Sequence, residues 1–245
     1  QVLLDTFIPN FEWNKEYLMA LVAILGTTIS PYLFFWQASM EMEEEMDRKL
    51  VVDKTIIKDM ETDVRGGLML TNVVFYFILL TSGTVLFQAG IFQVDTVEDA
   101  AKALKPLAGN AAYVLFALGV LGTGFLAIPV LAGSLSYMMA ETFNWEEGMN
   151  KKFHEAKGFY ITLILSLLVG LLILLIDIPA IKVLIYTAVL YGLIAPVVIA
   201  MVLHISNNKK VMGAYTNTVW SNFIGFLTLL LMAIAGVILL NFMFR

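Results

Sequence analysis

Long apolar stretches alternate with short polar segments along this chain of 245 residues. An α-helix of about 20 apolar residues crosses the hydrocarbon core of a bilayer, and the stretches are long enough to supply six such helices. The pattern therefore predicts an all-α membrane protein with six transmembrane helices. We place them at residues 17–40, 67–90, 111–141, a pair within 159–204, and 219–244.

The basic residues predict which side of the membrane each connecting segment occupies. Ten of the fifteen Lys and Arg residues fall in the segments 41–66, 142–158 and 205–218. Because cytoplasmic loops carry the excess of Lys and Arg, these three segments are predicted to be cytoplasmic. Segment 1–16 and the outer loop 91–110 then lie on the opposite side. Both ends of the chain fall outside, so we expect it to begin inside a longer protein.

Composition excludes several classes of function. The chain is 60% hydrophobic and only 14% charged, which is far from the balance of a soluble domain. It has no cysteine, so disulfides, zinc-thiolate sites and cysteine nucleophiles are excluded. It has no basic patch for a nucleic acid, no paired histidines at zinc spacing, and no nucleophile elbow or phosphate-binding loop. Because no basic segment or cleavage signature follows Gln1, we expect no signal peptide there. We therefore predict a protein that is not an enzyme and that has no resident cofactor.

One apolar stretch contains a helix-breaking sequence near its middle. Ser30 and Pro31 follow Gly26, Thr27 and Thr28 within span 17–40. Proline removes a backbone donor and clashes with the carbonyl group four residues earlier. Inside a membrane the freed polar groups are tolerated only against protein or a wet cavity, and secondary transporters place interrupted helices at their substrate sites. Span 17–40 is therefore predicted to be a broken helix next to a site.

Polar side chains continue from this break toward the predicted cytoplasmic end of the span. At about 3.6 residues per turn, Ser30, Gln37 and Glu41 point in nearly the same direction, and Thr27 lies on the face of Ser30. This stripe indicates a hydrophilic path lined by oxygen atoms. The alternative is that Thr27 and Ser30 only bond back to their own backbone, as hydroxyls in membrane helices often do. We interpret Glu43 to Glu45 as a solvated helix end and leave the role of Glu41 open.

Other spans hold fewer candidate residues. The glycine-rich span 111–141 indicates close helix packing, and Thr123 within it is a candidate for lining a cavity. Tyr191 lies near Pro196 in a span that holds further hydroxyl groups. The two histidines, at predicted helix ends, are interpreted as surface groups.

Two connecting segments show helical patterns of their own. Apolar residues recur at three- and four-residue steps in 41–66, which is consistent with a short helix along the membrane surface or with a solvated linker. Segment 95–105 begins with acidic residues and ends with lysines, the order that suits a helix dipole. We expect a short helix there, ended by Pro106 and Gly109.

The sequence Gly-Thr-Thr-Ile-Ser-Pro-Tyr-Leu-Phe-Phe-Trp-Gln-Ala-Ser at 26–39 resembles the sixth transmembrane helix of the Nramp family of divalent metal transporters, in its prokaryotic Nramp-related branch. Stretches at 106–110, 116–134 and 152–160 resemble the same family. The resemblance implies a LeuT-type fold built from inverted five-helix repeats. This chain would be the second repeat plus one extra helix, and the first repeat, whose Asp-Pro-Gly-Asn motif binds the metal, would belong to an N-terminal half of the same protein.

The chain departs from the classical pattern of that family at the metal site. Classical members have Ala-x-x-Met-Pro-His on helix six, with the alanine carbonyl and methionine sulfur on the metal. Thr27 replaces the alanine, Ser30 the methionine and Tyr32 the histidine, while Gln37 replaces a second histidine. Loss of the thioether favours hard cations such as Mg²⁺ or Mn²⁺. Loss of both histidines removes the groups suited to proton transfer near neutral pH.

Together these features predict a secondary transporter of divalent metal cations that works by alternating access in the cell membrane, expected to be a prokaryotic inner membrane. Its partners would be the metal ion, the lipid bilayer and the N-terminal half. The predicted metal ligands are Thr27, Thr28, Ile29 and Ser30, and the predicted pathway residues are Tyr32, Gln37, Glu41, Thr123 and Tyr191. Two alternatives stay open: a membrane scaffold or accessory subunit that transports nothing, and a carrier of organic solutes with the same fold.

Overall fold

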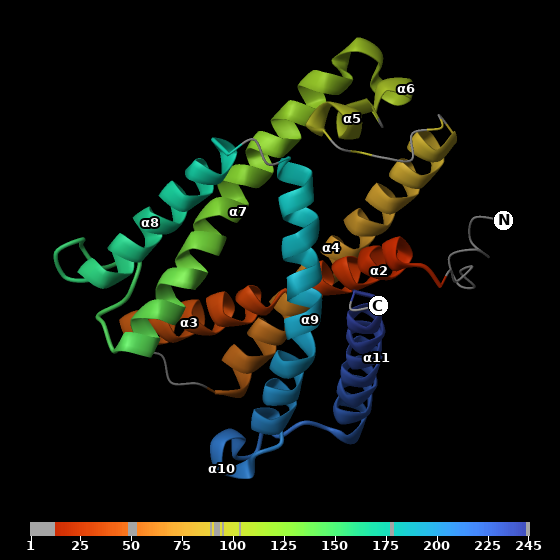
Figure 1. Ribbon diagram of the computed structural model, residues 1–245. Helices are drawn as coiled ribbons and strands as arrows, with labels where there is room; N and C mark the ends of the chain where they lie inside the picture. Colours follow the sequence, from red (N-terminus) through yellow and green to blue (C-terminus); the bar gives the residue numbers. More distant parts are fainter. Residues whose placement is uncertain are drawn as a thin grey trace. The chain divides into compact units, whose positions relative to one another are not determined.

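Helices joined by short turns make up the computed structural model (Figure 1). No strand occurs among the residues that the structure describes, which are 13–48, 53–88, 90, 94, 96–102, 104–176 and 179–243. The predicted all-α class is confirmed for these residues.

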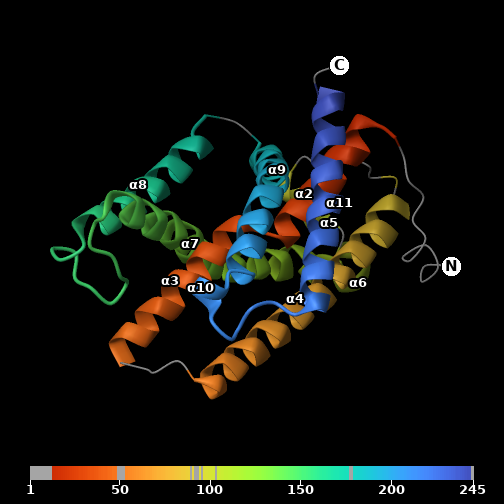
Figure 2. The same ribbon diagram turned by 90° about the horizontal axis from the view of Figure 1, so that it is seen from below.

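One unit of the chain comprises residues 1–31 and 182–245. It holds α2 (Lys15–Thr28), most of α9 (Ala180–Ser206), the short α10 (Lys209–Met212) and α11 (Val219–Met243). Both views show α11 running beside α9, to which it is joined through α10 (Figures 1 and 2). Asn14 caps α2 by accepting a hydrogen bond from the Tyr17 N–H at 2.7 Å, which is a favoured use of Asn at a helix start.

Two buried clusters hold this unit together. Leu18 and Val22, one turn apart on α2, pack with Val189 of α9 and with Ala235 and Leu239 of α11. The second cluster joins three α9 residues at four-residue steps, which share one helix face, to α11; it consists of Ala195, Ile199, Leu203 and Met232. The apolar periodicity of these helices therefore selects the faces that meet.

The second unit, residues 32–181, contains the rest of the helices. Its core joins α7 to α8, which run alongside each other (Figure 1), and includes the fully buried Tyr137, Ala140 and Phe159. The helices are α3 (Pro31–Arg48), α4 (Lys54–Gln88), α5 (Val97–Lys102), α6 (Lys105–Ala108), the 3₁₀ turn Gly109–Ala111, α7 (Ala112–Phe143) and α8 (Lys157–Leu174).

Within the described part of the chain, five helical segments are long and apolar enough to cross a membrane, which supports the predicted multi-pass membrane protein. They are 15–48, 54–87, 109–143, 180–206 and 219–243, the first of them including the interruption between α2 and α3. The sixth predicted span corresponds to α8, which is apolar but shorter. Its 18 residues extend about 27 Å at 1.5 Å per residue, slightly less than the hydrocarbon core.

The segment 41–66, predicted as a cytoplasmic loop, is largely helical. α3 continues to Arg48, and α4 begins at Lys54 after Asp53 accepts the N–H groups of Thr55 and Ile56. Ion pairs at four-residue spacing support both polar helix ends, because Arg48 pairs with Glu44 at 2.9 Å and Arg65 with Glu61 at 2.5 Å.

The side of the membrane on which each connecting segment lies is still a prediction. Most of the predicted outer segment 1–16, and the centre of the predicted turn between the helices of 159–204, lie outside the described residues.

The helix expected within 95–105 is present as α5. Its first turn carries Glu98 and Asp99 and its last turn carries Lys102. Asp99 and Lys102 form an ion pair at 2.5 Å, and this contact holds the pKa of the Asp99 carboxyl below its usual value. Pro106 does not end this helix as expected. It lies in the first turn of α6, where a missing N–H group costs nothing.

Candidate functional site

The apolar span 15–48 is interrupted at Ile29 and Ser30. α2 ends at Thr28 and α3 begins at Pro31, which is where the Ser-Pro sequence predicts a break. The N–H group of Ile29 still donates to the Leu25 carbonyl at 3.0 Å, but its backbone has left the helical region, with φ −112° and ψ 71°. Pro31 then starts α3 with the fixed φ that suits a first helical position.

All three hydroxyl groups at the interruption donate to backbone carbonyls. Thr27 and Thr28 both donate to the Ile24 carbonyl, at 3.0 and 2.8 Å, and Ser30 donates to the Thr27 carbonyl at 2.8 Å. This is the arrangement that the alternative interpretation of the hydroxyls expects. A hydroxyl oxygen that donates its proton keeps two lone pairs, so these contacts orient the oxygen atoms and leave them able to accept a further partner.

The end of α2 also presents backbone oxygen atoms. The last four carbonyl groups of an α-helix have no partner within the helix. Of these four in α2, Leu25 accepts from the Ile29 N–H group and Thr27 accepts from the Ser30 hydroxyl. The other two carbonyls belong to Gly26 and Thr28. Because Thr27 and Thr28 are exposed while Ser30 is buried, the interruption has one open side and one packed side.

Close helix packing holds the packed side in place. A Cβ atom on Gly26 would lie 2.3 Å from the Ala188 carbonyl oxygen of α9, and a Cβ atom on Gly192 would lie 2.4 Å from the Val22 carbonyl oxygen of α2. Ile29 packs against the buried cluster that joins α9 and α11. Tyr191, a predicted pathway residue, is the half-buried neighbour of Gly192 on α9.

The second unit positions the predicted pathway residues that follow the interruption. The Tyr32 carbonyl, in the first turn of α3, accepts a hydrogen bond from the buried Ser134 hydroxyl of α7 at 2.8 Å. Gln37 and Glu41, one turn apart on α3, line the same open groove, so the structure brings these two predicted residues together.

Thr123 does not join that groove. It is exposed on α7, and its hydroxyl donates to the Gly119 carbonyl of its own helix at 2.8 Å.

Acidic and imidazole ligands are scarce around the interruption. Across the described part of the chain, no cluster of three or more His, Cys, Asp or Glu side chains has the geometry to hold a metal ion. The interruption therefore offers neutral oxygen atoms from hydroxyl and carbonyl groups, and no carboxylate of its own.

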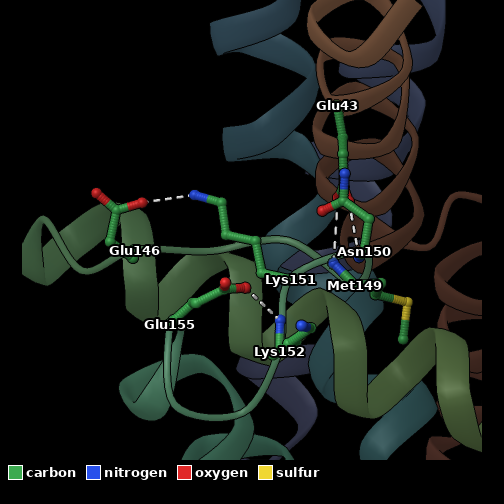
Figure 3. A network of polar contacts seen from close by, with 7 residues as sticks. All are labelled: Glu43, Glu146, Met149, Asn150, Lys151, Lys152 and Glu155. Carbon is green, nitrogen blue, oxygen red and sulfur yellow. Dashed lines mark hydrogen bonds and ion pairs between the residues drawn. The ribbon is translucent and has the colours of Figure 1, made fainter.

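Sequence reasoning missed one polar residue. Glu43 was expected to be part of a solvated helix end, but its carboxylate accepts a hydrogen bond from the Tyr137 hydroxyl of α7. It also accepts from two N–H groups of the loop between α7 and α8 (Figure 3). A local signal existed, because Glu43 follows Trp36 and Met40 at helical spacing, and both of these pack on the core.

The long apolar helices and the mid-span interruption define a multi-pass helical membrane protein. The Nramp family model, described as natural resistance-associated macrophage protein-like, matches residues 1–241. The chain therefore belongs to the Nramp family, as its resemblance in sequence indicates.

Relatives extend well beyond this chain. The divalent metal cation transporter MntH of Clostridium acetobutylicum is 26% identical over 247 residues, which cover 100% of this chain and 54% of the relative. MntH of Caldanaerobacter subterraneus subsp. tengcongensis is 25% identical over 93% of this chain and 51% of the relative. The uncharacterized membrane protein YcsG of Bacillus subtilis is 23% identical over 97% of this chain and 54% of the relative. The chain thus spans about half the length of these curated relatives.

Proposed function

We propose that this chain is the C-terminal half of a secondary transporter that carries divalent metal cations across a membrane by alternating access. The relatives named as divalent metal cation transporters support the cargo. The observation that carries the proposal is the interruption of an apolar membrane-length segment at Ile29 and Ser30. Broken helices at membrane depth are tolerated where they line a site.

The metal ion would be held by oxygen atoms at the end of α2. Residues Thr27 to Ser30 supply backbone carbonyls together with three hydroxyl oxygens that already have fixed orientations. A carbonyl or hydroxyl oxygen replaces water around a hard divalent cation at little geometric cost. The open side of the interruption, with Thr27 and Thr28 exposed, is where the cation would enter.

The charge of the cation must be balanced from outside this set of oxygens. The described residues provide no cluster of carboxylates or imidazoles for a metal, and an isolated dication far from water is costly. We therefore infer that the N-terminal half, to which the longer relatives point, contributes the acidic ligands.

The cargo is inferred to be a hard ion such as Mg²⁺ or Mn²⁺. Ser30 occupies the position where the classical family pattern has a methionine, and the chain has no cysteine. A site of oxygen atoms suits Mg²⁺, Ca²⁺ or Mn²⁺, whereas softer cations prefer sulfur. Mg²⁺ also keeps several of its waters, which agrees with a site that offers few protein ligands.

On the inner side, Gln37 and Glu41 would line the vestibule through which the ion leaves, because both face one groove on α3. Tyr32 follows the interruption closely in sequence, and Tyr191 is the neighbour of Gly192, which packs on Gly26 within the other unit; both stay proposed pathway residues. Thr123 on α7 stays a proposed pathway residue, although it lies outside that groove and its hydroxyl donates to its own helix.

Metal uptake by cells that express the full protein tests the proposal. Mn²⁺ uptake is measured in the presence of excess Mg²⁺ or Cd²⁺. We expect strong competition by Mg²⁺ and weak competition by Cd²⁺; a strong preference for Cd²⁺ would overturn the assignment of a hard ion. Competition by a small organic solute, with no effect of metals, would instead identify a solute carrier.

Substitutions at the interruption test the site itself. Thr27→Val and Ser30→Leu remove oxygen atoms and are expected to lower uptake by about tenfold or more, while Thr27→Ser retains the hydroxyl and most of the activity. Thr71→Val is the matched control, because the exposed Thr71 hydroxyl makes the same type of bond to its own helix. Equal uptake by all four variants, with normal membrane expression, would favour the scaffold alternative.

A further inference from the structure

One face of α3 is fastened to α7 and to the loop that follows it. Trp36, Met40, Glu43 and Asp47 recur at steps of four, three and four residues, so they share a helix face. Trp36 meets the Tyr137 ring edge-on, with ring centroids 6.0 Å apart, and a Cβ atom on Gly133 would collide with the same indole ring at 2.3 Å. The first two residues of this face, Trp36 and Met40, are apolar, and the last two, Glu43 and Asp47, are acidic.

The carboxylate of Glu43 accepts hydrogen bonds from three donors. One donor is the Tyr137 hydroxyl. The other two, drawn in Figure 3, are the backbone N–H groups of Met149, at 3.3 Å, and Asn150, at 3.1 Å. One helical turn further on, Asp47 accepts from the side-chain amide of Asn150. Two carboxylates of α3 therefore attach to a single short stretch of the loop.

The loop is already shaped to receive a carboxylate. Gly148 has φ +133°, a conformation that favours glycine, and a Cβ atom there would lie 3.2 Å from a Glu43 carboxylate oxygen. Tyr160 of α8 fixes the next residues from behind by donating to the carbonyls of Lys151, at 2.6 Å, and Met149, at 3.2 Å. Successive backbone N–H groups held in this way form an anion-binding nest.

Like charges oppose this attachment. Glu141 of α7 accepts a hydrogen bond from the buried Ser39 hydroxyl of α3 at 3.1 Å. Glu147, in the loop itself, has a pKa raised first by burial and then by the charges of Glu141 and Glu43. The carboxylate of Glu43 is thus held by directed hydrogen bonds within a predominantly acidic neighbourhood, which makes the contact specific in geometry and able to separate.

We infer that Glu43 is a positioning residue for transport: its carboxylate holds α3 on the α7–α8 loop in one state of the cycle and lets go when α3 moves. The inference rests on the proposed function. Gln37 and Glu41 lie on the same helix as Glu43, so the Glu43 contact also sets the position of the groove that they line. The three donors to Glu43 are more than 90 residues away in sequence, so the contact reports tertiary arrangement and not local helix stability.

A labelling experiment tests the contact independently of transport. The chain has no cysteine, so Gln37→Cys introduces a single reporter in the groove of this half, in a version of the full protein freed of any other cysteine. Its rate of reaction with a membrane-impermeant maleimide is measured in inside-out vesicles. Glu43→Gln replaces the charge by an amide whose carbonyl can accept from one loop N–H group while its NH2 group faces the other. It is expected to change this rate by about threefold or more.

Matched variants show whether a changed labelling rate reflects the position of α3 or a general loss of folding. Tyr137→Phe removes one donor and keeps the ring, so it should change the labelling rate in the same direction by a smaller factor. Glu45→Gln alters the neighbouring carboxylate of the same acidic run, which contacts neither the loop nor the groove among the described residues, and it should leave the rate unchanged. Glu43→Asp should recover part of the wild-type rate because the charge is retained.

Uptake kinetics then relate the contact to the cycle. We expect Glu43→Gln to change the maximal uptake rate by about threefold or more, with a smaller change in KM. The proposed ligands of the ion lie at Thr27 to Ser30, and the Glu43 carboxylate already accepts hydrogen bonds from the Tyr137 hydroxyl and two loop N–H groups. A Glu43→Gln protein that folds, labels at the wild-type rate and transports normally would overturn the inference. Altered labelling in a protein that moves no metal would support the contact and reject the transport function, so the two failures are distinguishable.

Discussion

Gly26 of α2 faces Gly192 of α9 at van der Waals contact of the two backbones: a Cβ atom on Gly26 would lie 2.3 Å from the Gly192 nitrogen. Each glycine occupies a space that no other side chain fits. Gly26 precedes Ile29 and Ser30 by three and four residues, so its contact with Gly192 fixes where the end of α2 presents its oxygen atoms. Small residues permit this approach between membrane helices.

Alanine at either position should therefore separate α2 from α9. We expect Gly26→Ala and Gly192→Ala each to cost about 1–3 kcal/mol in stability, the usual range for overpacking, and to reduce metal uptake as well. Thermal unfolding of the detergent-solubilised protein measures the first effect. The obstacle is backbone and not a movable side chain, so little relaxation is available.

Gly119→Ala on α7 is the control for this experiment. A Cβ atom there meets nothing within 4 Å, so alanine should stabilise the helix by up to about 1 kcal/mol through its better helix propensity. Equal unfolding temperatures for the Gly26→Ala and Gly119→Ala proteins would contradict the close packing of α2 and α9.

Ser134→Ala removes the hydrogen bond that α7 donates to the Tyr32 carbonyl at the start of α3. The expected cost is about 0.5–1.5 kcal/mol, measured as a lower midpoint of unfolding. Thr142→Val serves as its control, because the exposed Thr142 hydroxyl donates only to the Met138 carbonyl of its own helix. A Ser134→Ala protein as stable as wild type would show that this bond contributes nothing.

Glu147 should make the α7–α8 loop sensitive to pH. Burial raises the pKa of its carboxyl above the usual value, so the folded state binds this proton more tightly than the unfolded state. Ionisation of the buried carboxyl therefore lowers the free energy of unfolding. This destabilisation is fully present above the pKa of the folded state and is relieved as the pH falls through that pKa. One carboxylate oxygen of Glu147 is also buried without a hydrogen-bond partner in the described part of the structure.

Glu147→Gln removes that destabilisation. We expect the variant to protect the loop amides from hydrogen exchange more than wild type at neutral pH, by a margin that shrinks as the pH falls through the raised pKa of Glu147. Comparing the two proteins at the same pH cancels the intrinsic pH dependence of exchange. If the difference in amide protection between the two proteins stays constant as the pH is lowered, ionisation of Glu147 does not cause that difference.

A pair of amides joins α9 to α11. Asn207 and Asn222 exchange two side-chain hydrogen bonds, at 2.7 and 2.6 Å. A double-mutant cycle with Asn207→Ala and Asn222→Ala should give a coupling energy of about 0.6–1.7 kcal/mol, as measured for hydrogen bonds between membrane helices. Additive effects of the two substitutions, measured by unfolding, would show that the amides act separately.

Local features of this fold were readable in the sequence. Proline at 31 predicts the interruption because its effect on the helix is covalent, and the charge order around Asp99 and Lys102 predicts α5 because a dipole acts within one or two turns. The family was also readable, since the residues around Ser30 and Pro31 are distinctive.

Contacts between distant segments were not readable. The expectation for Glu43 was wrong because its partners, Tyr137 of α7 and Met149 and Asn150 of the following loop, lie about a hundred residues away in sequence. The meeting of Gly26 with Gly192 depends on the relative rotation of two helices, which hydrophobic periodicity does not specify. Segment 41–66 contains the end of α3 and the start of α4, and polar composition alone does not distinguish such solvated helix ends from a loop.

The boundary between the two units falls between Pro31 and Tyr32, directly after the interruption. α2 therefore takes its place from α9 and α11, while α3 takes its place from α7 and α8. The torsion angles of Ile29 and Ser30 must therefore be compatible both with the packing of α2 and with the packing of α3. Second-site suppressors of a damaging Ser30 substitution are accordingly expected far away, in α7 and α9, at residues that never touch the ion.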